Sequence, residues 1–430
     1  MKKYLVEYFN KHFFNKTKSA VIQEYKRFVK HTLGDESHPK HLEDLHDFGY
    51  LPLNIRSIPE GTVVPIRTPL LTIENTNPKF YWLTNYIESL ASAELWQPCT
   101  SASISRAYRT MLNKYAMETG NTEFVQFQGH DFSFRGMANL EAAAASGAGH
   151  LLSFVGTDSI PAIHYLEEHY GANIEKELVG TSIPATEHSV MCSYGQNELE
   201  TYRRLITEVY PSGFVSIVSD TWDFWTVLET VLPKLRNEIM TRNGRLVIRP
   251  DSGDPVKIIC GDDFSSRHSE SHGAMQKLWD VFGGTTNAKG YKELDTHIGL
   301  IYGDAITFER AQEISEKLKQ NGFASTNVVY GIGSYTYQYN TRDTLGFALK
   351  SSFVKINGEP KQIFKSPKTD PGFKKSFKGR VAVIRNSTGQ ISVTDGLIDY
   401  HENDIMKTIF LNGNTPYTST LNEIRLRLSQ

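Results

Sequence analysis

The sequence has few cysteines, and these are widely spaced. Its 430 residues include only Cys99, Cys192 and Cys260, which lie far apart and form no CxxC or CxxH pattern. This argues against a disulfide framework and against a zinc site of the usual spacing. The composition is typical of a protein of the reducing cytosol, so we expect a cytoplasmic location.

The sequence also lacks a long apolar run and a net charge. No apolar stretch reaches the ~18 residues that a membrane span needs, and the start, MKKYLVEYFNKHFF, is too polar for a signal peptide. The 46 basic and 48 acidic side chains give a net charge of −2. Without an overall field, neither nucleic acid nor a membrane is expected as a partner, and any anion must be bound locally.

Three regions follow one another along the chain. Residues 1–123 predict a mixed α/β region: a helix in VIQEYKRFVKHTL, strands in TVVPI and LLTIEN, and two helices in FYWLTNYIESLASAELW and ISRAYRTMLNKYAMETG. Residues 124–343 alternate short apolar runs with helical stretches. Residues 344–430 predict hairpins in GRVAVIRNSTGQISVTDG and TIFLNGNTPYTS. We expect this last region to pack back on the first and complete its domain.

The middle region predicts a parallel α/β barrel. Its apolar runs are FVQFQGHDFSFRG, HLLSFVGTD, GTSIPATEHS, FVSIVSD, RLVIRPDSGD, HIGLIYGDA and NVVYGIGS. Amphipathic helices lie between them, clearest in FWTVLETVLPKLRNEIM and TFERAQEISEKLKQNG. So many alternations of strand and helix indicate βαβ units that close into a barrel. The fold class expected is therefore α/β, a barrel beside a mixed α+β domain.

Polar residues follow each apolar run, where parallel α/β folds bind ligands. A single polar residue after a strand is usually a helix N-cap, and this is the favoured interpretation of Asp220, Ser252 or Asp304 taken alone. Acids mixed with arginines at one edge suit a ligand with a phosphate and a centre that becomes cationic, or one held through a divalent metal. In chain order these residues are Asp131, Arg135, Asp158, Glu187, His188, Ser219, Asp220, Asp223, Arg249, Asp251, Ser252, Gly303, Asp304, Gly331, Gly333 and Ser334.

Three segments carry hypotheses of their own. VVYGIGSYTYQYNTRD predicts a strand, a small-residue turn and a helix whose free N–H groups would hold phosphate, with an ordinary tight turn as the alternative. Arg342 on that helix is either a phosphate contact in a neighbouring subunit or a surface charge. Glu187 and His188 form an acid–base or phosphorylatable pair, or His188 is structural. The lysine-rich KQIFKSPKTDPGFKKSFKGR is a solvated loop or a di- or triphosphate site.

The motifs resemble one known family in order and spacing. These are HDFSFRG, SFVGTDS, SIPATEHS, VSIVSDTWD, VIRPDSGDP, YGDAI, YGIGS with TRD, and FKSP…DP…KGR. Together they resemble the nicotinamide phosphoribosyltransferases of the type II phosphoribosyltransferase family, from about the fourth residue to the end. The resemblance implies a homodimer with active sites at the subunit interface and an incomplete α/β barrel beside a mixed α+β domain. It also implies synthesis of nicotinamide mononucleotide and pyrophosphate from nicotinamide and 5-phosphoribosyl 1-pyrophosphate, in NAD biosynthesis.

The resemblance assigns the acceptor and energy-coupling residues. Phe132 would stack on the pyridine ring, and Arg249 would lie against its other side or its carboxamide. Asp158 would accept from the amide NH₂ and repel the carboxylate of nicotinate. His188 matches the histidine that ATP, a co-substrate, phosphorylates, and Glu187 would hold its imidazole.

It also assigns the residues around the donor. Arg135, Arg342, Lys350, Lys365 and Lys374 match positions that hold phosphate or pyrophosphate. Ser219, Asp223 and Asp251 match positions around ribose, diphosphate and Mg²⁺, while Gly303, Asp304, Gly333 and Ser334 match the 5-phosphate and ribose cradle. Mg²⁺ would come with the donor or ATP, and no residue is assigned as a protein ligand of a metal.

Two departures and several alternatives accompany this interpretation. Members of the family have a further N-terminal segment, which supplies an aromatic residue and a basic phosphate contact and which is expected to be missing here. The turn reads GIGSY where relatives are richer in glycine. The alternatives are a nicotinate phosphoribosyltransferase, disfavoured by Asp158, and a non-catalytic nucleotide-binding homologue. An aldolase-like barrel is disfavoured because no strand in the barrel region ends in a Schiff-base lysine.

Overall fold

The computed structural model describes residues 3–34, 38–262, 269–366, 369 and 376–429. By packing, the chain divides into two compact units. Unit 1 comprises Met1–Trp96, Glu168–Ala172 and Arg342–Gln430, and unit 2 comprises Gln97–Glu167 and Asn173–Thr341. In the described part of the chain, no helix is long and apolar enough to cross a membrane.

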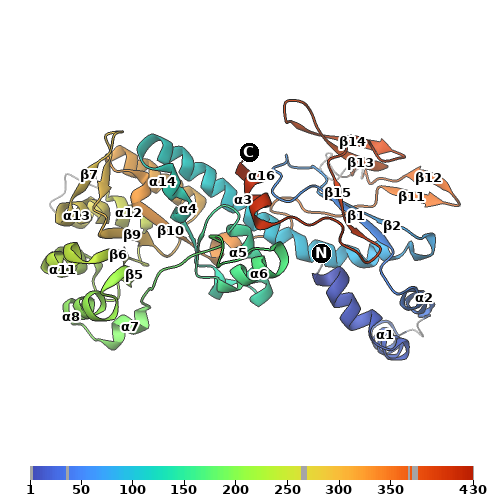
Figure 1. Ribbon diagram of the computed structural model, residues 1–430, viewed down its shortest axis with the longest axis horizontal. Helices are drawn as coiled ribbons and strands as arrows, with labels where there is room; N and C mark the ends of the chain where they lie inside the picture. Colours follow the sequence, from blue (N-terminus) through green and yellow to red (C-terminus); the bar gives the residue numbers. More distant parts are fainter. Residues whose placement is uncertain (1–2, 35–37, 263–268, 367–368, 370–375, 430) are drawn as a thin grey trace. The chain divides into compact units, whose positions relative to one another are not determined.

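A six-stranded parallel sheet forms the centre of unit 2, in the order β4-β3-β10-β9-β6-β5 (Figure 1). Its strands are apolar and buried; all five residues of β9, for example, are buried. Such runs are typical of parallel strands covered on both faces, and six of the predicted strands are confirmed. The bounds are β3 (Gly129–Asp131), β4 (Gly156–Thr157), β5 (Ser212–Val218), β6 (Asn243–Arg249), β9 (Ile298–Tyr302) and β10 (Val328–Ile332).

The run GTSIPATEHS, predicted as a strand, forms only isolated bridges. Thr181 pairs with Gly156 of β4, and Ala185 pairs with Ser216 of β5. The Ser216 amide donates to the Pro184 carbonyl at 2.8 Å, and the Thr186 amide donates to the Ser216 carbonyl at 2.9 Å. Pro184 has no N–H with which to extend this bridge along β5, so a regular ladder does not form. The segment therefore joins the two edge strands loosely, and the incomplete barrel that the family resemblance implied is confirmed.

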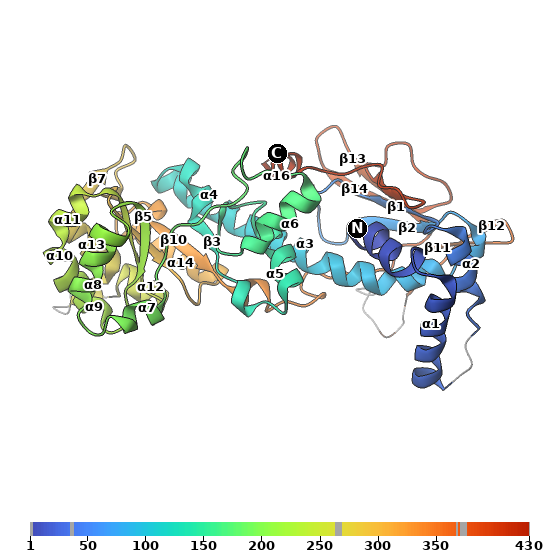
Figure 2. The same ribbon diagram turned by 60° about the horizontal axis from the view of Figure 1, so that its bottom comes forward.

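Helices alternate with these strands, and Figures 1 and 2 show α12 and α14 beside β10. The predicted helix in TFERAQEISEKLKQNG is confirmed as α14, capped by the Thr307 hydroxyl. The predicted helix at 224–240 is broken into short α-helices around a π-helical turn, Val227–Val231, and Pro233 removes one donor there. The bounds are α4 (Val125–Gln128), α5 (Leu140–His150), α6 (Ile160–Tyr170), α7 (His188–Ser193), α8 (Glu198–Arg204), α9 (Phe224–Thr226), α10 (Leu232–Lys234), α11 (Arg236–Thr241), α12 (Pro255–Cys260), α13 (Gly273–Phe282), α14 (Phe308–Gln320) and α15 (Ser334–Tyr337). A short hairpin, β7 (Gly284–Thr286) and β8 (Lys292–Leu294), completes the unit.

Unit 1 is built on the three-stranded antiparallel sheet β15-β1-β2. β15 pairs with β1, with Asn54 opposite Leu411, so the return of the C-terminal region to the first region is confirmed. The predicted hairpin in TIFLNGNTPYTS is wrong, because Leu411 makes only one bridge, with Asn414, and its strand pairs with β1 instead. The strands are β1 (Leu53–Ser57), β2 (Leu71–Asn75), β11 (Phe353–Ile356), β12 (Glu359–Gln362), β13 (Arg380–Arg385), β14 (Ile391–Leu397) and β15 (Lys407–Leu411).

Three further predictions for unit 1 have clear outcomes. The helix in VIQEYKRFVKHTL is confirmed as part of α1 (Lys18–Leu33), and the hairpin in GRVAVIRNSTGQISVTDG as β13 and β14. The strand predicted in TVVPI is wrong, since these residues form no ladder. The other helices of the unit are α2 (Lys40–Phe48) and α16 (Leu421–Ser429).

The two helices predicted between residues 80 and 119 are one. α3 runs over 37 residues, Leu83–Thr119, and contains Pro98. Proline in a helix interior costs about 3 kcal/mol, but residues before and after it are anchored: Ala91 lies in one hydrophobic core, and Tyr108 and Leu112 lie in another. Packing therefore decides the continuity, and it also assigns the second half of α3 to unit 2 although the pattern placed a boundary at residue 123.

Candidate active site

The carboxyl ends of the six parallel strands meet at one edge of the sheet in unit 2. At this edge, called the strand-end site below, each strand is followed by residues that the sequence singled out. Phe132 follows β3, Asp158 follows β4, and Asp251 follows β6. The others are Ser219 after β5, Arg249 at the end of β6, Gly303 and Asp304 after β9, and Gly333 and Ser334 after β10.

Phe132 lies on the ends of two neighbouring strands because glycines stand there. A β-carbon on Gly331 would lie 2.5 Å from Cδ2 of Phe132, and one on Gly303 would lie 3.5 Å from its Cε2. Any larger residue at 331 would displace the ring. His130 packs beside it, with ring centroids 4.9 Å apart. The strand-end site thus has an aromatic surface suited to a flat ring.

Asp158 is held as a carboxylate by two neighbours. His130 Nε2 lies 2.8 Å from its Oδ1, and the Ser182 hydroxyl donates to the same oxygen at 2.5 Å. Burial would raise the pKa of Asp158, but these bonds and the Arg249 charge lower it on balance. The side chain is 45% exposed, so an ionised acceptor faces outward beside Phe132. His130 and Ser182 were missed as site residues, although each lies inside a motif that was recognised.

Asp220, rather than Glu187, holds His188. Nε2 of His188 lies 3.0 Å from Oδ1 of Asp220, whose other oxygen accepts from the Asp251 amide at 2.9 Å and the Ser252 hydroxyl at 2.6 Å. Burial would raise the pKa of Asp220, but these hydrogen bonds lower it. The expectation that Glu187 orients the imidazole is wrong, because the partner sits at the next strand end.

Glu187 pairs with Arg135 instead. Nη2 of Arg135 lies 3.2 Å from Oε1 of Glu187, and both side chains are exposed. An exposed pair of this kind contributes little to stability, typically ~0–1 kcal/mol. Arg135 is therefore open to an anionic ligand.

Asp251 and Arg249 form the most buried charged pair of the strand-end site. Nε of Arg249 is 3.6 Å from Oδ2 of Asp251, and its Nη2 donates to the Thr186 carbonyl at 2.6 Å. Burial raises the pKa of Asp251. Its Oδ1 is buried and accepts no hydrogen bond in the described part of the chain, and a β-carbon on Gly303 would lie 2.2 Å from that oxygen. Glycine at 303 therefore makes room for an acceptor that a ligand or cation could use.

Ser219 and Asp223 take part in local structure. Ser219 is fully buried, and its hydroxyl donates to the Ile217 carbonyl and accepts from Tyr202 at 2.8 Å. Asp223 caps α9 through the Trp225 amide and the Thr226 hydroxyl. Asp304 is exposed. Their predicted contacts with ribose or diphosphate stay predictions.

The turn after β10 differs from the predicted phosphate loop. Gly333 precedes α15, which is one turn long, Ser334–Tyr337. The predicted helix is only this single turn, so the prediction that Arg342 lies on it is wrong: Arg342 lies beyond α15, in unit 1. A β-carbon on Gly136 would lie 2.0 Å from the Ser334 Oγ, so the hydroxyl packs against the loop after β3. Any anion here would be held by backbone N–H groups of a tight turn.

The remaining basic candidates belong to unit 1. Arg342 and Lys350 are exposed, and Nε of Arg342 lies 3.8 Å from Oδ1 of Asp343. Lys365 is exposed, and its backbone amide donates to the Ser376 hydroxyl. Lys374 lies outside the described residues.

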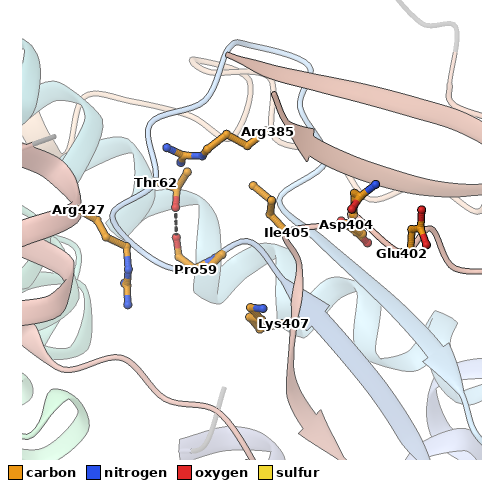
Figure 3. A pocket seen from close by; sticks show the side chains of 9 residues that line it. Pro59, Thr62, Arg385, Glu402, Asp404, Ile405, Lys407 and Arg427 are labelled. Atoms are coloured by element: carbon orange, nitrogen blue, oxygen red, sulfur yellow. Dashed lines mark hydrogen bonds between the residues drawn. The ribbon is translucent and has the colours of Figure 1, made fainter. Parts of the chain in front are cut away.

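Unit 1 also contains a hollow of about 490 Å³ (Figure 3). Arg427 lines it but already donates to the Glu60 carbonyl and the Ser419 hydroxyl. Asp404 lines it but is paired with Arg56 at 2.9 Å. Arg385 and Lys407 add positive charge and Glu402 adds negative charge. With its best-placed charges satisfied by the protein, this hollow is a weaker candidate than the strand-end site.

The strand-end site suits phosphate-bearing ligands better than a metal held by protein alone. Among the described residues, no group of three or more His, Cys, Asp or Glu could hold a metal ion. Mg²⁺ usually takes one or two carboxylates together with substrate phosphates. The donor set at Asp251 fits that arrangement.

Comparison with known proteins identifies the family. Residues 127–414 match the nicotinate phosphoribosyltransferase (NAPRTase) family. The chain belongs to this family. A nicotinamide phosphoribosyltransferase of Acinetobacter baylyi is 51% identical over 438 residues, which cover 99% of this chain and 86% of that protein. The enzyme of the same name from Mycoplasma pneumoniae is 40% identical, over 77% of this chain and 71% of its own.

A solved structure supports the fold. The chain superposes on the crystal structure of nicotinate-nucleotide pyrophosphorylase from Pyrococcus furiosus with a TM-score of 0.54, over 88% of this chain and 80% of that one. At 14% identity the likeness concerns architecture only. It agrees with the incomplete barrel of this family member.

Proposed function

We propose that the chain is a nicotinamide phosphoribosyltransferase, which makes nicotinamide mononucleotide and pyrophosphate from nicotinamide and 5-phosphoribosyl 1-pyrophosphate. The observation that carries this choice of acceptor is the carboxylate of Asp158 beside the ring of Phe132, held by His130 and Ser182. It accepts a hydrogen bond from a carboxamide but repels a carboxylate. The relatives named nicotinamide phosphoribosyltransferase support the same choice.

The reaction requires little acid–base chemistry. The pyridine nitrogen attacks C1 of the ribose with its lone pair while the bond from C1 to the pyrophosphate oxygen breaks, so no proton has to be removed. The transition state gains positive charge at C1, which carboxylates stabilise. Asp251 and Asp220, which lie at adjacent strand ends, would supply this negative charge. Phe132 would hold the ring in line for attack.

Mg²⁺ would be held by Asp251 together with pyrophosphate oxygens, where it would neutralise the leaving group. What supports this is the buried Oδ1 of Asp251, which has no hydrogen-bond partner among the residues that the structure describes. Arg135 would contribute positive charge from the exposed face of the strand-end site.

ATP stimulation through His188 is part of the same proposal. Nε2 of His188 donates to Asp220, so Nδ1 keeps the lone pair. Nδ1 would attack the γ-phosphorus of ATP, forming an N–P bond as ADP leaves. The phosphoryl group would place negative charge beside the donor's diphosphate and favour Mg²⁺ there.

The assembly and location expected are a cytoplasmic homodimer in which Arg342, Lys350, Lys365 and Lys374 hold phosphate groups. Two other functions compete with the proposal. Nicotinate phosphoribosyltransferase has the support of the family's name, and a non-catalytic nucleotide-binding homologue would share the fold.

Product analysis with each acceptor separates the three. With donor and Mg²⁺, nicotinamide should yield nicotinamide mononucleotide with a higher kcat/KM than nicotinate. Preference for nicotinate would refute the proposal. Binding of donor without product from either acceptor, in single-turnover conditions, would favour the non-catalytic reading.

A further inference from the structure

We propose that Tyr337 and His150 are positioning residues that tie the turn after β10 to the acceptor-selecting carboxylate of Asp158. The inference rests on the function proposed above. Both side chains are buried. They link the part of unit 2 that would hold the donor's phosphate to the part that would recognise the acceptor.

The hydrogen bonds of His150 define its tautomer. Its Nε2 lies 3.0 Å from the carbonyl oxygen of Gly156, and its Nδ1 lies 2.6 Å from the hydroxyl of Tyr337. A carbonyl can only accept, so Nε2 carries the proton and Nδ1 accepts from Tyr337. Burial lowers the pKa of His150, against the opposing charge of Asp131. The ring is therefore neutral, as this arrangement requires.

From His150 the contacts lead to Asp158. The Gly156 carbonyl that His150 holds belongs to β4, whose last residue precedes Asp158. A β-carbon on Gly156 would lie 2.8 Å from Nδ1 of His130, so the imidazole of His130 rests directly on this peptide. His130 in turn donates to Asp158 at 2.8 Å. The position of the β4 backbone thus sets that of the carboxylate.

From Tyr337 the contacts lead to the turn. Tyr337 is the last residue of α15, whose first residue is Ser334. The Gln338 amide donates to the Ser334 carbonyl at 2.6 Å, and the Thr336 amide donates to that of Gly333 at 3.1 Å. Burial raises the pKa of Tyr337 well above its ordinary value, so its hydroxyl stays protonated. A fully buried donor therefore anchors the turn to His150.

Loss of the hydrogen bond between Tyr337 and His150 should change the selectivity between the two acceptors. Without the Tyr337 hydroxyl, Nδ1 of His150 loses its donor, so the tautomer that donates from Nε2 to the Gly156 carbonyl of β4 is no longer fixed. Asp158 then presents its carboxylate less rigidly, so discrimination between nicotinamide and nicotinate falls while the KM for the donor rises. A purely structural bond would lower stability without changing the preference between acceptors.

Tyr337→Phe tests this, with Tyr330→Phe as the matched control. Tyr330 is also fully buried in unit 2, and its hydroxyl lies 3.1 Å from the Ser315 hydroxyl. Tyr330 lies within β10 rather than in the turn after it. Both variants should lose similar thermal stability. Only Tyr337→Phe should lower the ratio of kcat/KM for nicotinamide over nicotinate, by about 5- to 30-fold, the range of one to two kcal/mol.

A double variant decides whether Tyr337 acts through Asp158. In the Asp158→Asn background, Tyr337→Phe should leave the acceptor ratio unchanged, because the carboxylate it positions is gone. Equal shifts in both backgrounds, or equal ratios for Tyr337→Phe and Tyr330→Phe, would overturn the inference. Should Tyr337→Phe not fold, His150→Gln replaces it, with the same expected loss of ratio.

The proposed function and this inference fail separately. If wild-type protein shows no preference for nicotinamide, the proposed function is wrong. The KM for the donor then tests whether Tyr337 and His150 connect the turn to β4. This KM should rise in Tyr337→Phe and stay constant in Tyr330→Phe. A donor KM that stays constant in both variants would overturn the inference as well.

Discussion

At the scale of single residues, we expect acceptor choice to depend on the ionisation of Asp158. Hydrogen bonds from His130 and Ser182 keep its pKa low despite burial. A carboxylate with two donors already in place is a poor partner for a second anion, and its remaining lone pairs suit an amide N–H. On the proposed function, we therefore expect the preference between nicotinamide and nicotinate to depend on this one charge and the two groups that hold it.

Asp158→Asn should weaken use of nicotinamide by ~1–3 kcal/mol in kcat/KM, the scale of a lost charged hydrogen bond, and relax rejection of nicotinate. Steady-state kinetics with both acceptors measures this. Asp295→Asn, which removes a carboxylate paired with His297 elsewhere in unit 2, is the control and should change neither value. An unchanged acceptor preference in Asp158→Asn would refute the role.

His188→Ala should abolish ATP hydrolysis and ATP stimulation but leave some synthesis without ATP, because the carboxylates and the aromatic surface remain. Labelled ATP should give an acid-labile phosphate on wild-type protein and none on the variant. His297→Ala removes another histidine paired with an aspartate, at 2.6 Å, and should retain the label. Wild-type ATP stimulation in His188→Ala would make His188 structural.

At the scale of secondary-structure elements, the short helix α8 buries an acidic side chain. Glu198 begins α8 and is 7% exposed, with Oε1 buried and without a hydrogen-bond partner among the described residues. Burial, and then the charge of Asp223, raise the pKa of Glu198 from 4.5 to about 7. The folded protein therefore binds a proton here that the unfolded chain releases.

This shift makes stability depend on pH. Between about pH 4.5 and 7 the folded state holds the proton and the unfolded state does not, so stability falls as pH rises through this window and is constant above it. Glu198→Gln should remove this loss, roughly 1–3 kcal/mol, and be more stable than wild type at pH 8 but similar at pH 4.5. Urea unfolding at the two pH values measures it. Glu200→Gln, exposed on the same helix, should show the wild-type dependence; a wild-type dependence in Glu198→Gln would contradict the assignment.

At the scale of the whole molecule, we expect Arg342 to connect donor binding with assembly. It belongs to unit 1, where it is exposed, and we expect it to contact phosphate in a homodimer. Arg342→Ala should weaken donor or pyrophosphate binding by ~1.5–3 kcal/mol without loss of thermal stability. Titration calorimetry, with sedimentation to establish the dimer, tests this. Arg385→Ala, another exposed arginine of unit 1, is the control. A monomer at assay concentrations, or unchanged affinity, would refute the role.

The sequence alone determined the alternation of strands and helices. A parallel strand that is buried on both faces must be apolar, and the residues after its carboxyl end must be polar where ligands bind. This local chemistry predicted six strands of the sheet and the position of residues such as Asp158 and Asp251. Prediction from local patterns failed where packing between distant segments decided the structure. β15 pairs with β1 rather than with its own continuation, and α3 continues through Pro98 because both of its halves are packed.

The tertiary structure decided which polar groups meet. Glu187 and His188 are adjacent in sequence, yet the imidazole bonds to Asp220 from the next strand end. No pattern within one segment shows that His130 and Ser182 converge on Asp158, or that His150 and Tyr337 form a hydrogen bond. Hydrogen bonds depend on distance and direction between groups far apart in the chain. The sequence therefore shows which polar residues follow the strands. The hydrogen-bond partner of each one, and with it the pKa or tautomer, is determined only when the strands lie side by side.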